Sequence, residues 1–296
     1  MSNQKWTAEN IPGQDGRVAI VTGSSSGIGF ETARVLADKG AEVIIAVRNL
    51  SKGNNAAAKI NEQHPDAKLR VMQLDLANLE SVRDFAEEFK SGFERLDLLI
   101  NNAGVMVPPY SKTTDGFELQ FGTNHLGHFA LTGALIDLLK TTRGSRVVNV
   151  SSVAHRQGNI DFDDLNWEKR SYKPWKAYSD SKIANIYFTR ELGRRLGNDT
   201  IVSMAHPGWT ATELQRNSGM AGFFNTFFAQ GIDMGALPTL YAAVAPEVET
   251  GDYYGPSGMM EMRGFPTKAK IVKRALDDQI AARLWDVSER LTATSY

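Results

Sequence analysis

Short runs of β-branched and aliphatic residues alternate with longer helical patterns along most of the chain, and this alternation limits the fold more than any other feature. The clearest helical segments are Gly27–Lys39, Asn78–Ser91 and Trp175–Leu196. A strand, helix, strand order implies right-handed crossovers and a parallel sheet with helices on both faces. We therefore expect a doubly wound α/β fold of the Rossmann type, with strands at Arg17–Thr22, Glu42–Val47, Lys68–Gln73, Leu96–Ile100, Ser145–Val150 and Thr200–Ala205.

Nothing in the sequence marks a second domain. There is no proline-rich or low-complexity linker, no repeat and no block of like charge. We expect a polar N-terminal arm over residues 1–16 and a single domain over residues 17–296. A C-terminal amphipathic helix is predicted from apolar residues spaced three or four apart, namely Leu276, Ile280, Leu284, Val287 and Leu291.

Two stretches interrupt the alternation. Residues 157–174 form a polar and aromatic insertion, and residues 219–231 hold four phenylalanines between glycines. The second composition suits a lid over an apolar ligand, placed around residues 213–231. A core-packed helix or a subunit contact would explain the same composition. The four phenylalanines are Phe223, Phe224, Phe227 and Phe228.

Composition argues against several classes of function. The chain has 33 Lys and Arg against 34 Asp and Glu, so its formal charge of −1 favours neither nucleic acid nor an anionic membrane as partner. It has no cysteine, which excludes disulfides, thiolate metal sites and a cysteine nucleophile. His125 and His128 lack a third ligand at metal spacing, so we expect no metal. Without a signal-like N-terminus or a run that could span a bilayer, we expect a cytoplasmic protein.

A glycine-rich turn follows the first predicted strand and leads into a helix. Residues 22–29 read Thr-Gly-Ser-Ser-Ser-Gly-Ile-Gly. Glycine lets the backbone turn sharply and approach a pyrophosphate, and the amides at the helix N-terminus then face the anion. A plain turn is the alternative, although the position between strand and helix favours a nucleotide site. The candidate cofactor residues are Gly23, Ser25, Ser26, Gly27, Ile28 and Gly29.

Three later strand ends extend this candidate cofactor site. The second strand ends without the carboxylate that binds the ribose of NAD, and Arg48 there is suited to the 2′-phosphate of NADP. A solvated arginine is the alternative. Asp75 follows the third strand, where it can accept from the adenine amine, and residues 101–104 follow the fourth. The candidates are Arg48, Asn49, Asp75, Leu76, Asn102, Ala103 and Gly104, and we expect NADP as cofactor.

Tyr178 and Lys182 stand four residues apart in a predicted helix, so both side chains project from one face. A free phenol has a pKa of about 10 and transfers protons poorly at neutral pH. We expect the neighbouring ammonium to lower the pKa of Tyr178 toward the range of general acid and base catalysis. A surface contact is the alternative for an isolated pair of this kind.

Two further polar positions lie near the same edge of the predicted sheet. Ser151 and Ser152 end the fifth strand, where a hydroxyl can donate to a substrate oxygen. Asn124 falls in the helix after the fourth strand, and its amide could hold a water that relays protons to Lys182. An ordinary polar helix residue is the alternative for Asn124.

In this order, these residues resemble the short-chain dehydrogenase/reductase family over about residues 17–208. Residues 22–29 match the family's cofactor motif and residues 101–104 its sheet motif. The resemblance implies a catalytic tetrad of Asn124, Ser152, Tyr178 and Lys182, and it selects Ser152 over Ser151. It also implies that Lys182 bonds the nicotinamide ribose and that the segment after the sixth strand contacts the nicotinamide carboxamide, through Pro207, Gly208, Thr210 and Thr212.

The gap between Ser152 and Tyr178 is longer than in most members. This gap and the sequences of residues 151–155 and 127–129 resemble the branch of retinol dehydrogenases, WW-domain oxidoreductases and light-dependent protochlorophyllide reductases, which implies NADP(H). We therefore expect an oxidoreductase that interconverts a carbonyl and an alcohol on a small apolar substrate, as a dimer or tetramer. The alternatives are a nucleotide-binding regulator without turnover and a sugar-nucleotide epimerase or dehydratase. Candidates for the substrate pocket or a subunit contact are Tyr253, Tyr254, Met259, Met260 and Arg263.

Overall fold

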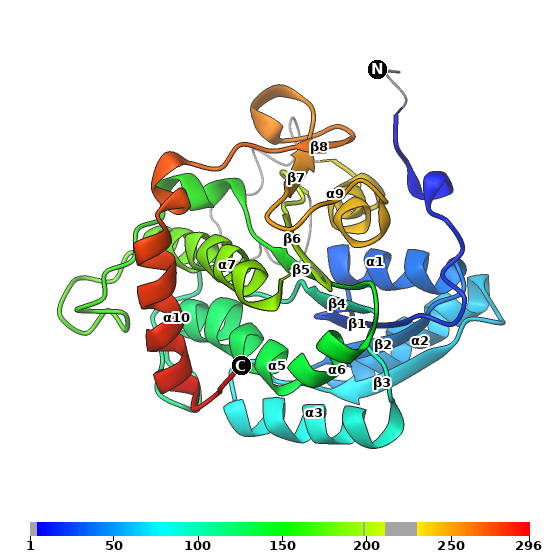
Figure 1. Ribbon diagram of the computed structural model, residues 1–296, viewed down its shortest axis with the longest axis horizontal. Coiled ribbons are helices and arrows are strands. Elements are labelled where there is room, and N and C mark those ends of the chain that lie inside the picture. The colour runs from blue at the N-terminus through cyan, green and yellow to red at the C-terminus, as the bar shows by residue number, and fades with distance from the viewer. Residues whose placement is uncertain (1–4, 198, 211–229) are drawn as a thin grey trace.

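The computed structural model describes residues 5–197, 199–210 and 230–296. Within these ranges eight strands form one sheet, in the order β3-β2-β1-β4-β5-β6-β7-β8 (Figure 1). All neighbouring strands are parallel except β8, which is antiparallel to β7. The strands are β1 (Val18–Thr22), β2 (Glu42–Val47), β3 (Leu69–Gln73), β4 (Leu98–Asn101), β5 (Ser145–Val150), β6 (Thr200–Ala205), β7 (Tyr253–Pro256) and β8 (Pro266–Lys268).

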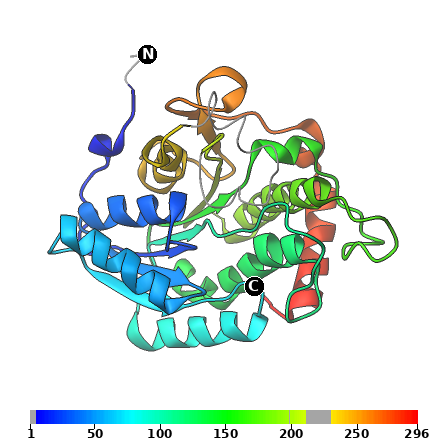
Figure 2. The same cartoon turned by 180° about the vertical axis from the view of Figure 1, so that it is seen from behind.

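Helices cover both faces of the sheet, as the doubly wound prediction requires (Figures 1 and 2). Successive residues of a strand point to opposite faces, so Val21 packs in the core beneath α1 and α9 while Ile20 packs in the core beneath α3 and α5. The helices are α1 (Gly27–Asp38), α2 (Leu50–Gln63), α3 (Leu79–Gly92), α4 (Leu119–Phe121), α5 (Gly127–Ala134), α6 (Ile136–Thr141), α7 (Pro174–Leu196), α9 (Ile232–Val244) and α10 (Asp278–Thr292).

The six predicted strands are confirmed, and β7 and β8 were not predicted. β7 reads Tyr-Tyr-Gly-Pro and β8 begins with proline, so neither has the continuous β-branched pattern that marks a buried strand. Tyr253 and Tyr254 are each only 2% exposed inside β7. The expectation that these two tyrosines line a substrate pocket or a subunit contact is therefore wrong, because they belong to the core.

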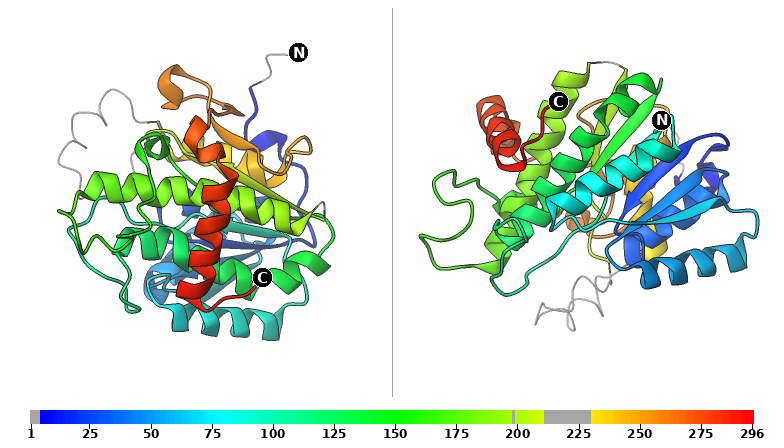
Figure 3. Two further views of the ribbon diagram at one scale, coloured as in Figure 1. Left: turned by 60° about the vertical axis from the view of Figure 1, so that its left-hand side comes forward. Right: turned by 90° about the horizontal axis from the view of Figure 1, so that it is seen from below.

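The predicted helix boundaries agree closely with α1, α3 and α7. Pro174, with φ already suited to a helix, occupies the first turn of α7. The C-terminal helix also exists, and it packs across α7 (Figure 3). Leu276 does not belong to it: the Asp277 carboxylate accepts from the amides of Gln279 and Ile280, so α10 begins after Leu276 and leaves that side chain 43% exposed.

Between Gln157 and Pro174 the chain forms no helix or strand, in agreement with an irregular insertion, which projects beside α7 (Figure 1). The four phenylalanines and nearly all of the expected lid lie outside the described residues. None of the helices in the described ranges combines the length and the apolar character that crossing a membrane requires.

Candidate active site

A cavity of about 690 Å³ lies at the carboxyl edge of the sheet, where the strand order reverses around β1. Thr212 lies outside the described residues, and Asn124 lies behind the cavity wall. Every other predicted site residue lines the cavity: Gly23, Ser25, Ser26, Gly27, Ile28, Gly29, Arg48, Asn49, Asp75, Leu76, Asn102, Ala103, Gly104, Ser152, Tyr178, Lys182, Pro207, Gly208 and Thr210.

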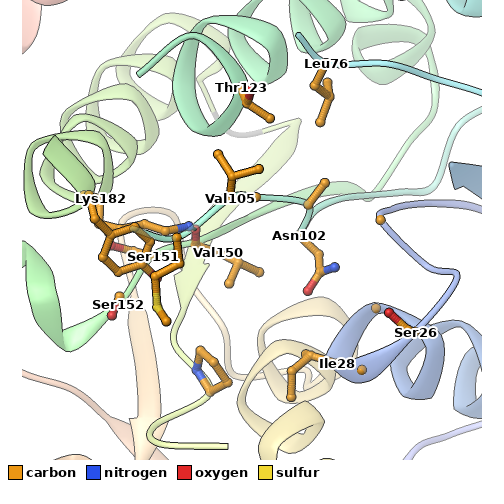
Figure 4. Close-up of a pocket in the computed structure, with 18 of the residues that line it drawn as sticks. Ser26, Ile28, Leu76, Asn102, Val105, Thr123, Val150, Ser151, Ser152 and Lys182 are labelled. Carbon is orange, nitrogen blue, oxygen red and sulfur yellow. Dashed lines mark hydrogen bonds between the residues drawn. The ribbon is translucent and has the colours of Figure 1, made fainter. Parts of the chain in front are cut away.

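The glycine turn forms one wall of this cavity, opposite Ser152 and Lys182 (Figure 4). Gly23 and Gly27 have φ of 67° and 61°, a region that side chains other than glycine rarely adopt. A Cβ on Gly29 would lie 2.5 Å from the Gly23 carbonyl oxygen, so only glycine lets α1 begin this close to β1. The wall therefore places a helix N-terminus on the cavity, which fits the pyrophosphate of a dinucleotide.

Two cations lie at the far end of the same cavity. Arg48 is exposed, and it forms no ion pair with any carboxylate among the described residues. The side chain of Asn49 caps α2 by accepting from the Lys52 amide at 2.9 Å. Because α2 begins directly after this cap, Lys52 lies in its first turn, close to Arg48. Lys52 also lines the cavity. Sequence reasoning missed Lys52, although its position one turn into the helix after Arg48 was a usable signal.

The catalytic candidates meet at the other end. Lys182 Nζ donates to the Val150 carbonyl oxygen at 3.1 Å and lies 5.6 Å from the centre of the Tyr178 ring. The Ser152 hydroxyl accepts from the Ala154 amide at 3.2 Å and lies beside the Tyr178 phenol. The Ser151 hydroxyl instead donates to the backbone carbonyl oxygen of Lys182 in α7 at 2.8 Å. Its proton is therefore already engaged in a hydrogen bond within the protein.

The protonation states differ from the sequence expectation. Burial raises the pKa of Tyr178 to about 12, and the hydrogen bond with Ser152 offsets only part of this rise. Burial lowers the pKa of Lys182 to about 8. The expected lowering of the tyrosine pKa is therefore wrong for the protein without ligand, because burial disfavours the charged phenolate. Near neutral pH both groups carry their protons.

Asn124 holds a backbone loop. It lies in a π-helical turn (η2, Gly122–Leu126) rather than in the expected regular helix. Its amide nitrogen donates to the Val105 carbonyl oxygen at 3.0 Å and to the Ser181 hydroxyl at 2.9 Å, and its amide oxygen accepts from the Val105 amide at 2.8 Å. Both amide hydrogens are thus used, and a role for Asn124 in a proton relay stays a prediction.

The segment after β6 lines the same cavity through residues 207–210. Gly208 has a φ of 67°, and a Cβ there would lie 2.3 Å from the Met262 carbonyl oxygen. The Thr210 hydroxyl donates to the Pro207 carbonyl oxygen at 3.0 Å. Met259 and Met260 are 74% and 70% exposed. Neither of these methionines nor Arg263 is among the described residues that line the cavity, and their place in a substrate pocket or a subunit contact stays a prediction.

Several apolar residues that line the cavity were not predicted from the sequence. Trp175 precedes Tyr178 by three residues, so both side chains emerge from one face of α7, with ring centres 6.3 Å apart and ring planes at 82°. The indole is 40% exposed. The i, i+3 spacing was a usable signal for Trp175. Met106 and Trp209 line the cavity from loops, and Val153 and Ala154 line it from the short 3-10 helix Val153–Gln157 after β5.

The fold and the cavity define a dinucleotide-binding α/β protein of the class that includes many oxidoreductases. The family model described as short chain dehydrogenase matches residues 17–221. The chain belongs to this family of nicotinamide-dependent oxidoreductases, and the resemblance inferred from its motifs is confirmed.

The relatives point to the same branch that the sequence resembled. Human retinol dehydrogenase 13 is 43% identical over 288 residues, which cover 93% of this chain and 84% of that protein. Mouse retinol dehydrogenase 12 is 44% identical, with 92% and 85% covered. A crystal structure of an uncharacterised protein from Mycobacterium paratuberculosis is 43% identical, with a TM-score of 0.84 over 99% of both chains. A short chain dehydrogenase from Shigella flexneri complexed with NADP is 27% identical, with a TM-score of 0.66 over 81% of this chain and 96% of that one.

Proposed function

We propose that the protein is an NADP(H)-dependent oxidoreductase that interconverts an apolar carbonyl compound and its alcohol. One observation carries the proposal: Ser152, Tyr178 and Lys182 line the same 690 Å³ cavity as the glycine turn. A volume of this size suits a nucleotide cofactor with a small substrate beside it. The nicotinamide, when bound, supplies or accepts the hydride at the substrate carbon.

In carbonyl reduction Tyr178 acts as the general acid. Its phenol is protonated at neutral pH, since burial raises its pKa to about 12, so it can donate its proton to the substrate oxygen. The Ser152 hydroxyl donates a second hydrogen bond to that oxygen as negative charge develops on it. The Lys182 ammonium, with a pKa of about 8, stabilises the phenolate left after proton transfer.

The cofactor is held along the length of the cavity. The N-terminus of α1 and the glycine turn bind the pyrophosphate, and Asp75 accepts from the adenine amine. Arg48 and Lys52 bind the 2′-phosphate that distinguishes NADP from NAD. Lys182 donates to the nicotinamide ribose, and the segment after β6 contacts the carboxamide through Pro207, Gly208, Thr210 and Thr212.

The substrate lies on the apolar side of Tyr178. Met106, Val153, Ala154 and Trp175 line the cavity there, which favours an aliphatic or aromatic carbonyl over a sugar nucleotide. Relatives that share more than 40% of the sequence are named retinol dehydrogenases, in keeping with an apolar substrate. A cytoplasmic location and a dimer or tetramer remain predictions from the sequence.

The direct test replaces Tyr178 by phenylalanine. Loss of the transferable proton is expected to lower kcat by at least about a hundredfold, while NADPH affinity stays near the wild-type value. Tyr187→Phe is the matched control: this buried tyrosine also lies on α7, but its hydroxyl donates to the Arg274 carbonyl oxygen away from the cavity. NADPH consumption would be followed over aliphatic, aromatic, steroid and retinoid carbonyls.

Full activity of Tyr178→Phe would refute the assigned acid. Tight NADPH binding by the wild-type protein without turnover of any carbonyl in the panel would instead support a nucleotide-binding regulator.

A further inference from the structure

The loop from Asn102 to Val105 forms the cavity wall between the glycine turn and the catalytic residues (Figure 4). It is held at both ends by side chains. At its start, the amides of Asn102 and Ala103 both donate to the Thr22 hydroxyl oxygen at 2.9 Å. At its end, Val105 exchanges two hydrogen bonds with the side-chain amide of Asn124, at 2.8 and 3.0 Å. The position of this wall therefore depends on Thr22 and Asn124.

The buried imidazole of His128 joins these two supports. Its Nδ1 lies 3.1 Å from the backbone carbonyl oxygen of Asn124, and its Nε2 lies 3.0 Å from the Thr22 hydroxyl oxygen. The ring is 1% exposed, and burial lowers its pKa to about 4, so the imidazole is neutral near neutral pH. A carbonyl oxygen only accepts, so the single ring proton lies on Nδ1 and Nε2 is an acceptor.

This tautomer fixes the Thr22 hydroxyl. Only the threonine can supply the proton between Thr22 and Nε2, so the hydroxyl donates to His128. Its oxygen then presents its lone pairs to the amides of Asn102 and Ala103. The other acceptor near the threonine, the Ile100 carbonyl oxygen, is farther away at 3.3 Å. Without His128 the hydroxyl would turn toward that carbonyl, and its alignment with the two loop amides would weaken.

We propose that His128 is a positioning residue that holds the loop 102–105 in place for the cofactor, by fixing the Thr22 hydroxyl that supports the start of the loop, while its contact with the Asn124 backbone sets the tautomer. The link to the cofactor rests on the proposed function, whereas the effect on the loop itself does not. No contact of His128 with the substrate or the cofactor is implied.

The experiment compares two replacements that keep different halves of the ring. In His128→Gln the side-chain oxygen reaches the position of Nε2 and can still accept from Thr22. In His128→Asn the amide reaches only the position of Nδ1, so the link to Thr22 is lost. His125→Asn is the matched control, because His125 is an equally buried histidine of the same segment that bonds Ser288 and packs against Phe188, away from the cavity.

Hydrogen exchange in the ligand-free protein is the first readout. We expect His128→Asn to speed exchange of the loop amides by about fivefold relative to β5, and His128→Gln and His125→Asn to leave that ratio unchanged. The second readout is the dissociation constant for NADPH, expected to rise by about fivefold in His128→Asn alone. Equal effects of His128→Asn and His125→Asn, or of the Asn and Gln replacements at position 128, would overturn the proposal.

A spectroscopic measurement on the wild-type protein keeps the test independent of variant folding. The ¹⁵N chemical shifts of the His128 ring should show a protonated Nδ1 and an unprotonated Nε2, and the opposite tautomer would overturn the proposal. If the loop amides respond as expected but the wild-type protein binds no nicotinamide nucleotide, the proposed function fails while the role of His128 in the loop stands. If NADPH binds and the loop amides do not respond, His128 has no positioning role.

Discussion

Replacing Arg48 and Lys52 by alanine tests how the protein discriminates NADP from NAD. Both side chains line the cavity, and no carboxylate of the described residues pairs with Arg48. The 2′-phosphate is the only group that NADP has and NAD lacks. If these two cations bind it, their removal should weaken NADPH binding and leave NADH binding almost unchanged.

The expected magnitude follows from their exposure. A charge-assisted hydrogen bond contributes about 1.5–3 kcal/mol, and both side chains are exposed to water and salt, so the lower value applies. About 1.4 kcal/mol corresponds to tenfold in affinity. Each single replacement should therefore raise the NADPH dissociation constant about tenfold, and the double replacement about a hundredfold. The preference for NADPH over NADH should fall by the same factors.

Fluorescence titration of both nucleotides at low and high ionic strength is the assay. Lys59→Ala is the control, because Lys59 is an exposed lysine of α2 that does not line the cavity. Screening should reduce the effect of Arg48→Ala and Lys52→Ala at high salt. Equal loss of NADPH and NADH affinity, or an effect of Lys59→Ala as large as that of Lys52→Ala, would refute a specific phosphate contact.

Three further predictions concern the catalytic end of the cavity. Because Lys182 has a pKa of about 8, kcat/KM for carbonyl reduction should be level below about pH 8 and fall above it as the ammonium loses its proton, and Lys182→Met should lack this transition in a pH–rate profile. Ser152→Ala should lower kcat by about a hundredfold, whereas Ser151→Ala should mainly lower the melting temperature, since its hydroxyl bonds the Lys182 carbonyl; the opposite pattern in kinetics and calorimetry would exchange the two roles. Trp175→Ala should raise KM for bulky aromatic carbonyls about tenfold and leave KM for small aldehydes unchanged, and an equal change for both would show that the indole does not contact substrate.

Most of the fold follows from the sequence because the central parallel strands are buried on both faces. β2, β5 and β6 have the predicted bounds, and all residues but one of each strand are buried. The strands beyond β6, namely β7 and β8, could not be predicted in this way. β7 contains glycine and proline, and its pairing with β6 and β8 depends on the rest of the sheet rather than on its own pattern.

The candidate site was predictable where a motif fixes the backbone and unpredictable where contacts come from distant loops. The glycine turn and the pair Tyr178 and Lys182 are local patterns, and the structure brings both to one cavity. Met106 lines the same cavity from the loop after β4, and no local pattern sets it apart from other apolar residues. The contact of His128 with Thr22 could not be predicted either, because Thr22 lies 106 residues earlier in the chain. Tertiary packing alone gives these residues their place.

The protonation state of Tyr178 could not be predicted from the sequence for a different reason. The spacing of Tyr178 and Lys182 shows that a charge is near the phenol, but it does not show how far the phenol is removed from water. Burial acts on both members of the pair: it raises the pKa of the phenol to about 12 and lowers that of the Lys182 ammonium to about 8. A neutral phenol beside a cation is ready to donate a proton. Alcohol oxidation instead needs the phenolate, which is scarce at neutral pH unless further positive charge enters the cavity. The oxidised nicotinamide ring carries such a charge and the reduced ring does not, so the redox state of the bound cofactor would set whether Tyr178 serves as base or acid.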